Sequence, residues 1–142
     1  MIDNRILQYL DDSDEFKLVP EFQIKFRKVL LDYGVQSDSA IIDLMCTYAG
    51  EFNGKIGFII NVAEDLNDFE NSVTRQLIEK EKINPIYISL FNFEFDDYLL
   101  YNIKEDSVVL IDGGNFKDLV NNNFSDKWNS FNEFLLYYFS IS

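Results

Sequence analysis

The chain contains no histidine and only one cysteine, Cys46, among its 142 residues. Histidine is the commonest general base in enzymes and a common zinc ligand, so its absence excludes Ser-His-Asp and Cys-His catalysis and histidine-based metal sites. A lone cysteine cannot form an intramolecular disulfide. Because its neighbours Leu44, Met45 and Thr47 supply no cation to activate a thiolate, we expect Cys46 to be a core residue.

Long apolar runs are also absent. The longest uninterrupted one, Phe134 to Phe139, is far shorter than the roughly 20 residues that a membrane-spanning helix needs. The acidic pair Asp11 and Asp12 follows Met1 too closely for the apolar stretch of a signal peptide. We therefore expect a cytoplasmic protein that does not enter membranes.

Basic residues are scarce, with 12 Lys and Arg against 25 Asp and Glu, which gives a formal net charge of −13. Such a charge raises solubility and repels phosphate backbones and anionic membranes, so we do not expect nucleic acid to be a ligand. The excess of acid has two interpretations: a well-solvated surface, or an acidic face for a basic partner.

Aromatic and aliphatic residues, in contrast, are abundant. The chain is 47% apolar and contains 14 Phe and 8 Tyr, which is enough for a folded core. Its length is close to that of one domain, so we expect a single domain over residues 1–142.

Apolar residues at three- and four-residue spacing predict helices over 21–33, 39–49 and 66–82, with a short helix around Ile6 to Leu10. Gly34 is well placed to end the first of the three. Ser130 and Glu133 match a capping box and predict a closing helix that includes Phe134 and Tyr138.

Four strands are predicted, over 56–62, 86–97, 98–103 and 108–111. Phe91, Phe93 and Phe95 alternate with polar residues, which is typical of a half-buried strand. The connection over 104–107 is short enough for a β-hairpin. The predicted fold class is α+β, with a small antiparallel sheet packed by N-terminal helices and a C-terminal helix.

Carboxylates are the remaining candidates for chemistry. Glu94 and Asp96 are predicted to share one strand face, within reach of a divalent metal or a sugar. This leaves open an enzyme hypothesis, a metal-dependent hydrolase that uses Glu94, Asp96 and Asp97. We favour no enzymatic activity, no cofactor and no metal, because the sequence contains no rigid set of ligands.

Two local motifs fail as ligand sites. The stretch 65–70 begins like a calcium loop, but Phe69 stands where an oxygen ligand belongs and Glu70 where glycine is needed. The stretch Asp112-Gly113-Gly114-Asn115 lacks the spacing and the lysine of a phosphate loop and is interpreted as a turn. The aromatic residues are interpreted mainly as core, with an exposed minority among Tyr87, Tyr98, Tyr101, Trp128 and Tyr137 suited to a protein interface.

Several segments resemble the SUKH superfamily. The helical stretches FRKVLLDYG (26–34) and IDLMCTYAG (42–50), the latter followed by Asn53-Gly54, are similar to the opening helices of that group. Residues 97–103, 108–112 and 130–135 resemble its hairpin and closing helix. The resemblance implies an α+β domain with a small antiparallel sheet.

The resemblance also implies a non-catalytic role. Bacterial members of the superfamily are mostly immunity proteins that neutralise toxins, often nucleases, whereas yeast members of the Smi/Knr type regulate cell-wall synthesis through binding partners. Our leading hypothesis is an immunity protein that binds a basic toxin domain. The alternative is a Smi/Knr-type regulatory or scaffold protein.

The strand pattern locates a hypothetical binding face. If the alternating Phe residues point to the core, their neighbours must point to solvent. The predicted partner-binding residues are Glu94, Asp96 and Asp97, with Glu64, Asp65 and Asp68 as a second rim. A solvated strand face without any partner is the alternative.

Overall fold

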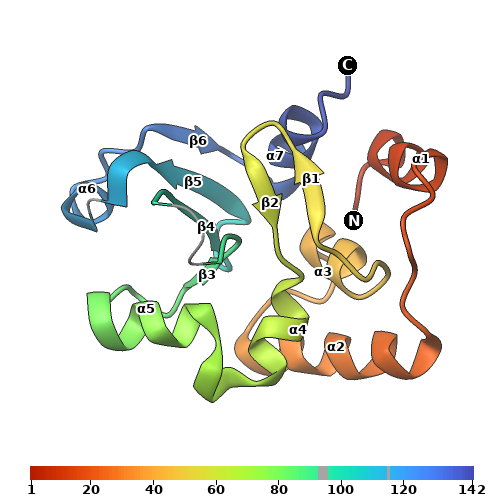
Figure 1. The fold of residues 1–142 in the computed structure, drawn as a ribbon, viewed down its shortest axis with the longest axis horizontal. Coiled ribbons are helices and arrows are strands. Elements are labelled where there is room, and N and C mark those ends of the chain that lie inside the picture. Colours follow the sequence, from red (N-terminus) through yellow and green to blue (C-terminus); the bar gives the residue numbers. More distant parts are fainter. Residues whose placement is uncertain (93–95, 115) are drawn as a thin grey trace.

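The computed structural model of the chain describes residues 1–92, 96–114 and 116–142. Its N-terminal part consists of three helices, α1 (Asn4–Asp12), α2 (Pro20–Tyr33) and α3 (Ala40–Met45) (Figure 1). The first two were predicted, and α2 ends at Gly34, which has a φ of 115° that favours glycine. The third helix is shorter than the predicted 39–49. Residues 47–49 instead pair with 16–18, through Ala49 N–H to Phe16 O and Leu18 N–H to Thr47 O, both at 2.8 Å.

A two-stranded hairpin, β1 (Phe52–Gly54) and β2 (Gly57–Ile59), follows these helices. The predicted strand over 56–62 is therefore only partly correct, because α4 (Val62–Asn67) begins where that strand was expected to end. Asn61 explains the change, since its side chain accepts hydrogen bonds from the first free amides of α4 and so starts a helix.

The single helix predicted over 66–82 is also wrong. The structure has the end of α4, a short 3₁₀ turn η1 (Phe69–Asn71), and then α5 (Val73–Glu81). Ser72 is the N-cap of α5, and its hydroxyl accepts from the Arg75 amide at 3.0 Å. The capping side chain of Ser72 thus starts a new helix within the stretch that was predicted as one helix.

A four-stranded antiparallel sheet contains β3 (Tyr87–Ser89), β4 (Tyr98–Asn102), β5 (Ser107–Ile111) and β6 (Asp126–Trp128), in that order. The β4–β5 hairpin was predicted. The strand predicted over 86–97 is cut to three residues, and the buried Phe91 lies beyond its end. Phe93 and Phe95 lie outside the described residues. Strand β6 was not predicted, because it is short and begins with two exposed charged residues.

The remaining elements are η2 (Asp112–Gly114), α6 (Phe116–Val120) and α7 (Phe131–Tyr138). The turn predicted over 112–115 is present as η2 over its first three residues, and Asn115 lies outside the described residues. The predicted start of α7 is confirmed: the Ser130 hydroxyl accepts from the Glu133 amide at 3.1 Å, and the Glu133 carboxylate accepts from the Asn129 amide at 3.0 Å.

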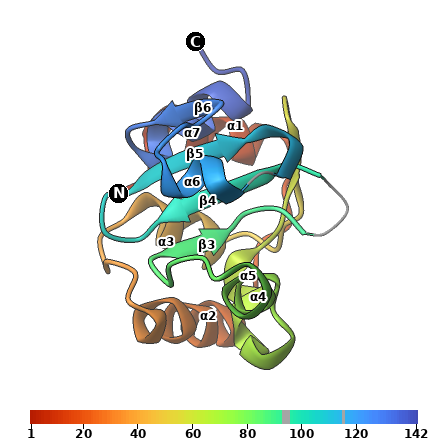
Figure 2. The same cartoon turned by 90° about the vertical axis from the view of Figure 1, so that its left-hand side faces the viewer.

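The sheet is buried on both faces. Leu99, Tyr101 and Val108 belong to the main core, which also contains residues of α1, α2, α3 and α7. Their neighbours Leu100 and Val109 point the other way, into a second core formed with α5 and α6. Figure 2 shows these two helices in front of the sheet. Two covered faces explain why β4 and β5 are almost continuously apolar rather than alternating.

The predicted fold class is confirmed: an α+β domain with small antiparallel sheets covered by helices. The main core joins Ile2 near the N-terminus to Phe139 near the C-terminus. In the described parts of the chain, none of the helices has both the length and the apolar character needed to cross a membrane.

Candidate functional site

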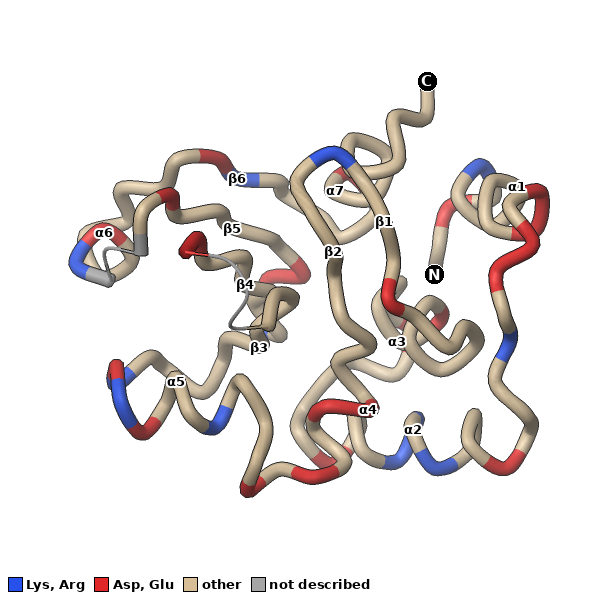
Figure 3. Tube along the Cα trace, viewed as in Figure 1, with Lys and Arg blue, Asp and Glu red and all other residues tan. Residues whose placement is uncertain are grey.

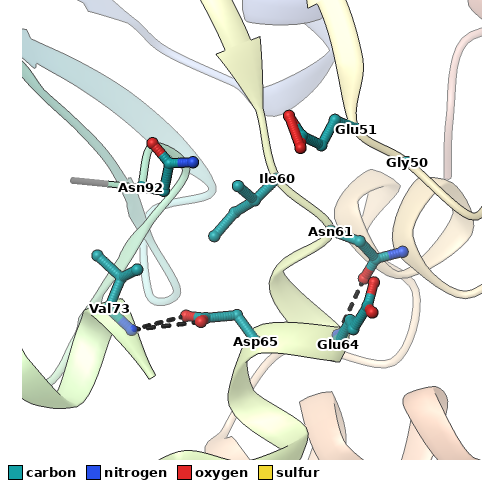
Figure 4. A pocket seen from close by; sticks show the side chains of 8 residues that line it. All are labelled: Gly50, Glu51, Ile60, Asn61, Glu64, Asp65, Val73 and Asn92. Carbon is teal, nitrogen blue, oxygen red and sulfur yellow. Dashed lines mark hydrogen bonds between the residues drawn. The ribbon is translucent and has the colours of Figure 1, made fainter. Parts of the chain in front are cut away.

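An open pocket of about 290 Å³ lies where β2, α4 and the start of α5 meet (Figure 4). Its lining comes from four places in the chain: Gly50 and Glu51 before β1, four residues around the start of α4, Val73 of α5, and Asn92 after β3. The four residues around the start of α4 are Ile60, Asn61, Glu64 and Asp65. Ile60 and Val73 supply apolar surface, while carboxylates of Glu51, Glu64 and Asp65 supply negative charge. The pocket thus combines an apolar lining with acidic groups.

Asn61 builds one wall of this pocket. Its side chain is buried, and its amide oxygen accepts from the amides of Ala63 at 3.0 Å and Glu64 at 3.1 Å. Its amide nitrogen donates to the carbonyls of Met45 and Tyr48, both at 2.9 Å. The oxygen of the Asn61 side chain therefore holds the start of α4, and its nitrogen holds the end of α3. These bonds fix the position of Glu64 in the first turn of α4.

Asp65 also lies in the first turn of α4, and its side chain is half-buried. Its carboxylate accepts from the Val73 amide at 3.1 and 3.3 Å, as Figure 4 shows, and so caps α5 together with Ser72. Burial raises the pKa of Asp65 to about 6, with hydrogen bonds from Val73 and Thr74 opposing the shift and the nearby Asp68 and Glu64 adding to it. Asp65 is primarily a structural residue that happens to line the pocket.

Glu51 and Glu64 are different, because both are exposed. The ion pairs found among the described residues include neither of them. Their charges are therefore available to a cation from outside the chain. Carboxylates beside the apolar surface of Ile60 and Val73 can receive the aliphatic stem and charged head of a lysine or arginine.

The structure places the six predicted binding residues in different surroundings. Glu64 and Asp65 line the pocket, and the exposed Asp68 lies just after α4, where it accepts from the Asn71 side chain at 2.9 Å. Asp96 is exposed, whereas the half-buried Asp97 accepts from the Gly113 amide at 3.0 Å and so holds η2. Glu94 lies outside the described residues.

Asp96 and Asp97 do not lie on the predicted strand over 86–97, because β3 ends at Ser89 and β4 begins at Tyr98. The connection between β3 and β4 reaches the pocket through Asn92. Of the residues that sequence reasoning missed, Asn61 carried a signal, since Asn followed by Glu64 three residues later is a helix-start pattern. Glu51 and Asn92 had no such signal, because only tertiary contacts bring them to α4.

Acidic residues gather in two regions of the fold. Figure 3 shows them along α4 with the turn that follows it, and again from the end of α1 into its connection with α2. The cations of α2, including Lys25 and Lys28, lie between these regions in the chain. The excess negative charge is thus uneven over the surface.

Cys46 is buried, as predicted, and burial raises the pKa of its thiol to about 11. A thiol with that pKa is almost entirely protonated near pH 7, so it is a poor nucleophile. Over residues 1–92, 96–114 and 116–142, no group of three or more Asp, Glu or Cys side chains is arranged to hold a metal ion.

Of the five aromatic residues considered for an interface, Tyr101 and Trp128 are buried, Tyr87 and Tyr98 are half-buried, and Tyr137 is exposed. The Tyr137 ring lies beside the Trp128 ring, with centroids 5.2 Å apart, and the ammonium group of Lys55 lies 4.7 Å from the Tyr137 ring centroid. None of these five aromatic residues lines the pocket beside α4.

Comparison with protein-family models, with curated proteins and with solved structures found no match to this chain. The resemblance to the SUKH superfamily therefore stays a prediction that rests on the sequence segments quoted above.

Proposed function

We propose that the chain is a non-catalytic immunity-type protein that neutralises a basic toxin domain by direct binding, with the pocket beside α4 as part of the contact. The observation that carries the proposal is the pair of exposed carboxylates, Glu51 and Glu64, which line a pocket together with the apolar side chains of Ile60 and Val73. A partner's lysine or arginine side chain matches both features, since its stem is apolar and its head is cationic.

Charge supports the same kind of partner. With a formal net charge of −13, the chain attracts a basic polypeptide over a distance and accelerates its association. A nuclease toxin carries a cationic surface for its phosphate substrate. An acidic protein bound there neutralises the toxin by covering that surface, and it needs no chemistry of its own.

The proposal is tested by affinity purification from the native organism with this chain as bait. The expected result is a basic polypeptide that stops cell growth when expressed alone and is tolerated when co-expressed with this chain. Recovery of cell-wall synthesis components, with no toxic polypeptide, contradicts the proposal and favours the Smi/Knr-type regulatory alternative.

The role of the pocket is tested separately, by comparing two double variants with equal charge change. Glu51→Lys with Glu64→Lys reverses the pocket carboxylates, whereas Asp38→Lys with Glu81→Lys reverses two exposed carboxylates elsewhere. We expect the pocket variant to weaken toxin binding at least tenfold more than the control variant, with equal melting temperatures. Equal loss in both variants means that only the net charge matters and removes the pocket from the interface.

A further inference from the structure

The carboxylate of Asp65 belongs to two parts of the molecule at once. It accepts hydrogen bonds from the Val73 amide at the start of α5, and it also lines the pocket beside α4. Figure 4 shows it on the far side of Ile60 from the Glu51 carboxylate. A cationic group that enters the pocket therefore meets a carboxylate that already holds a helix start.

The charges around Asp65 are negative. Those that act on its carboxyl are Asp68 and Glu64, and both favour the protonated form. The exposed Glu51 adds a third negative charge to the pocket lining beside Glu64 and Asp65. The influences that favour the charged form are hydrogen bonds from two backbone amides of α5, which carry no charge.

The cations of the chain are engaged elsewhere. Arg75, in the first turn of α5, pairs with Glu70 at 3.4 Å and with Glu79 at 3.5 Å. Among the described residues, the pocket lining contains neither lysine nor arginine. Burial and like charges both disfavour a charged carboxyl, so Asp65 holds a proton more readily than an exposed aspartate does. A cation from another molecule would reverse that balance.

We propose that a partner's cationic side chain and a proton compete for the pocket at Asp65, so that mild acid releases the partner. The proposal rests on the proposed function for the kind of occupant, a lysine or arginine side chain. A bound cation stabilises the charged carboxylate, and the carboxylate stabilises the bound cation by the same free energy. That attraction is lost when the carboxyl takes up a proton.

The size of the effect follows from this linkage. Without an occupant, the pKa of Asp65 is raised to about 6. If the occupant returns the pKa to its usual 3.8, affinity at pH 5 is about tenfold lower than at pH 7.5. Affinity therefore falls as pH drops through about 6, the direction expected when the free protein binds the proton more tightly than the complex does.

The probe is the tripeptide acetyl-Gly-Lys-Gly-amide, titrated at constant ionic strength into the ¹⁵N-labelled full chain and followed by NMR. A tripeptide with norleucine in place of lysine keeps an apolar stem and lacks the charge. We expect the lysine peptide to shift the amide signals of residues 60–65 and 73–74, with a Kd about tenfold larger at pH 5 than at pH 7.5. The norleucine peptide should bind more weakly, with a Kd that does not depend on pH.

Two isosteric variants with equal charge change separate Asp65 from its surroundings. Asp65→Asn removes the carboxyl in the pocket, whereas Asp68→Asn removes an exposed carboxyl that does not line it. We expect the Kd of the lysine peptide for Asp65→Asn to change less than about twofold between pH 5 and pH 7.5, and that for Asp68→Asn to change at least about fivefold.

The wild type alone supplies a reciprocal measurement, which needs no variant to fold. A ¹³C NMR titration follows the Asp65 carboxyl with and without the lysine peptide. Saturating peptide should lower the midpoint of this titration by at least about one pH unit, because the bound cation favours the charged form.

Four results overturn the proposal: no saturable binding of the lysine peptide at pH 7.5, equal Kd values at pH 5 and pH 7.5, equal pH dependence in the two variants, or a titration midpoint that the peptide leaves unchanged. The two proposals fail separately. If a toxin binds the wild type and Asp65→Asn with the same pH dependence, the competition is wrong and the immunity function stands. If the peptide behaves as expected and no toxin is found, the competition stands and the immunity function fails.

Discussion

The four-stranded sheet buries apolar side chains on both faces, whereas the segment from Gly50 to Val73 adds polar side chains at its helix and strand ends to core residues such as Phe52 and Val62. In the sheet, Leu99 and Leu100 lie next to each other and enter different cores. In the pocket segment, Asn61, Asp65 and Ser72 hold helix starts, and the Tyr138 hydroxyl joins α7 to the hairpin.

The two regions should therefore lose stability through different kinds of substitution. Apolar burial is non-directional and spread over many contacts, so its loss scales with the volume removed. A capping bond is directional and depends on one atom, so an isosteric change can remove it entirely. The pocket beside α4 lies in the second kind of structure.

The largest effects are expected in the sheet. Leu99→Ala and Leu100→Ala should each lower the free energy of unfolding by about 2–5 kcal/mol, because both side chains are fully buried, although on opposite faces. Urea denaturation measures both. A loss below about 1 kcal/mol for either variant would contradict tight packing on that face of the sheet.

Asn61→Ala should cost about 2–4 kcal/mol, since it removes an N-cap and leaves the Met45 and Tyr48 carbonyls without their donor. The control is Asn67→Ala, an exposed position in the same helix, with an expected change within about 0.5 kcal/mol. Similar melting temperatures for the two variants contradict the role given to Asn61.

Tyr138→Phe should cost about 1–2 kcal/mol. The hydroxyl accepts from the Ile59 amide at 3.2 Å, lies 2.6 Å from the Phe52 carbonyl, and also contacts the Gly57 carbonyl. The matched control is Tyr137→Phe, next to it but exposed. Denaturation curves that coincide for the two variants show that the hairpin does not depend on this bond.

The most specific effect is the pH dependence at Asp65. A folded-state pKa of about 6, above the usual 3.8, means that the folded state holds the proton more tightly than the unfolded state. The stability that this carboxyl contributes is present in full at low pH and is lost as pH rises through about 4 to 6. Asp65→Asn removes the charge and keeps an oxygen that can accept from Val73.

The variant should therefore gain stability relative to the wild type as pH rises to 7. Because the sequence pI is about 4.2, solubility favours melting temperatures measured from pH 5 upward. A constant difference between the two proteins from pH 5 to pH 7.5 contradicts the raised pKa.

Much of the fold could be predicted because its signals are local. The periodicity of α2, the capping box of α7 and the short turn between β4 and β5 each depend on residues a few positions apart. Within the candidate site, Glu64 and Asp65 could be proposed because acidic residues that follow an apolar stretch are visible in the sequence. The predictions failed where two local signals compete, as at Asn61, which ends an apolar run and begins a helix.

The sequence by itself determined the α+β class, the surplus of negative charge and the lack of histidine chemistry, since each follows from composition or from short-range patterns. Only the tertiary structure decided which acidic residues become structural and which stay free. The carboxylates of Asp65 and Asp97 accept hydrogen bonds from the amides of Val73 and Gly113, which lie 8 and 16 positions further along the chain. Glu51, in contrast, precedes the β1–β2 hairpin and lines the pocket beside α4. Such choices depend on long-range contacts that form when the two cores pack, and no local pattern in the chain contains them.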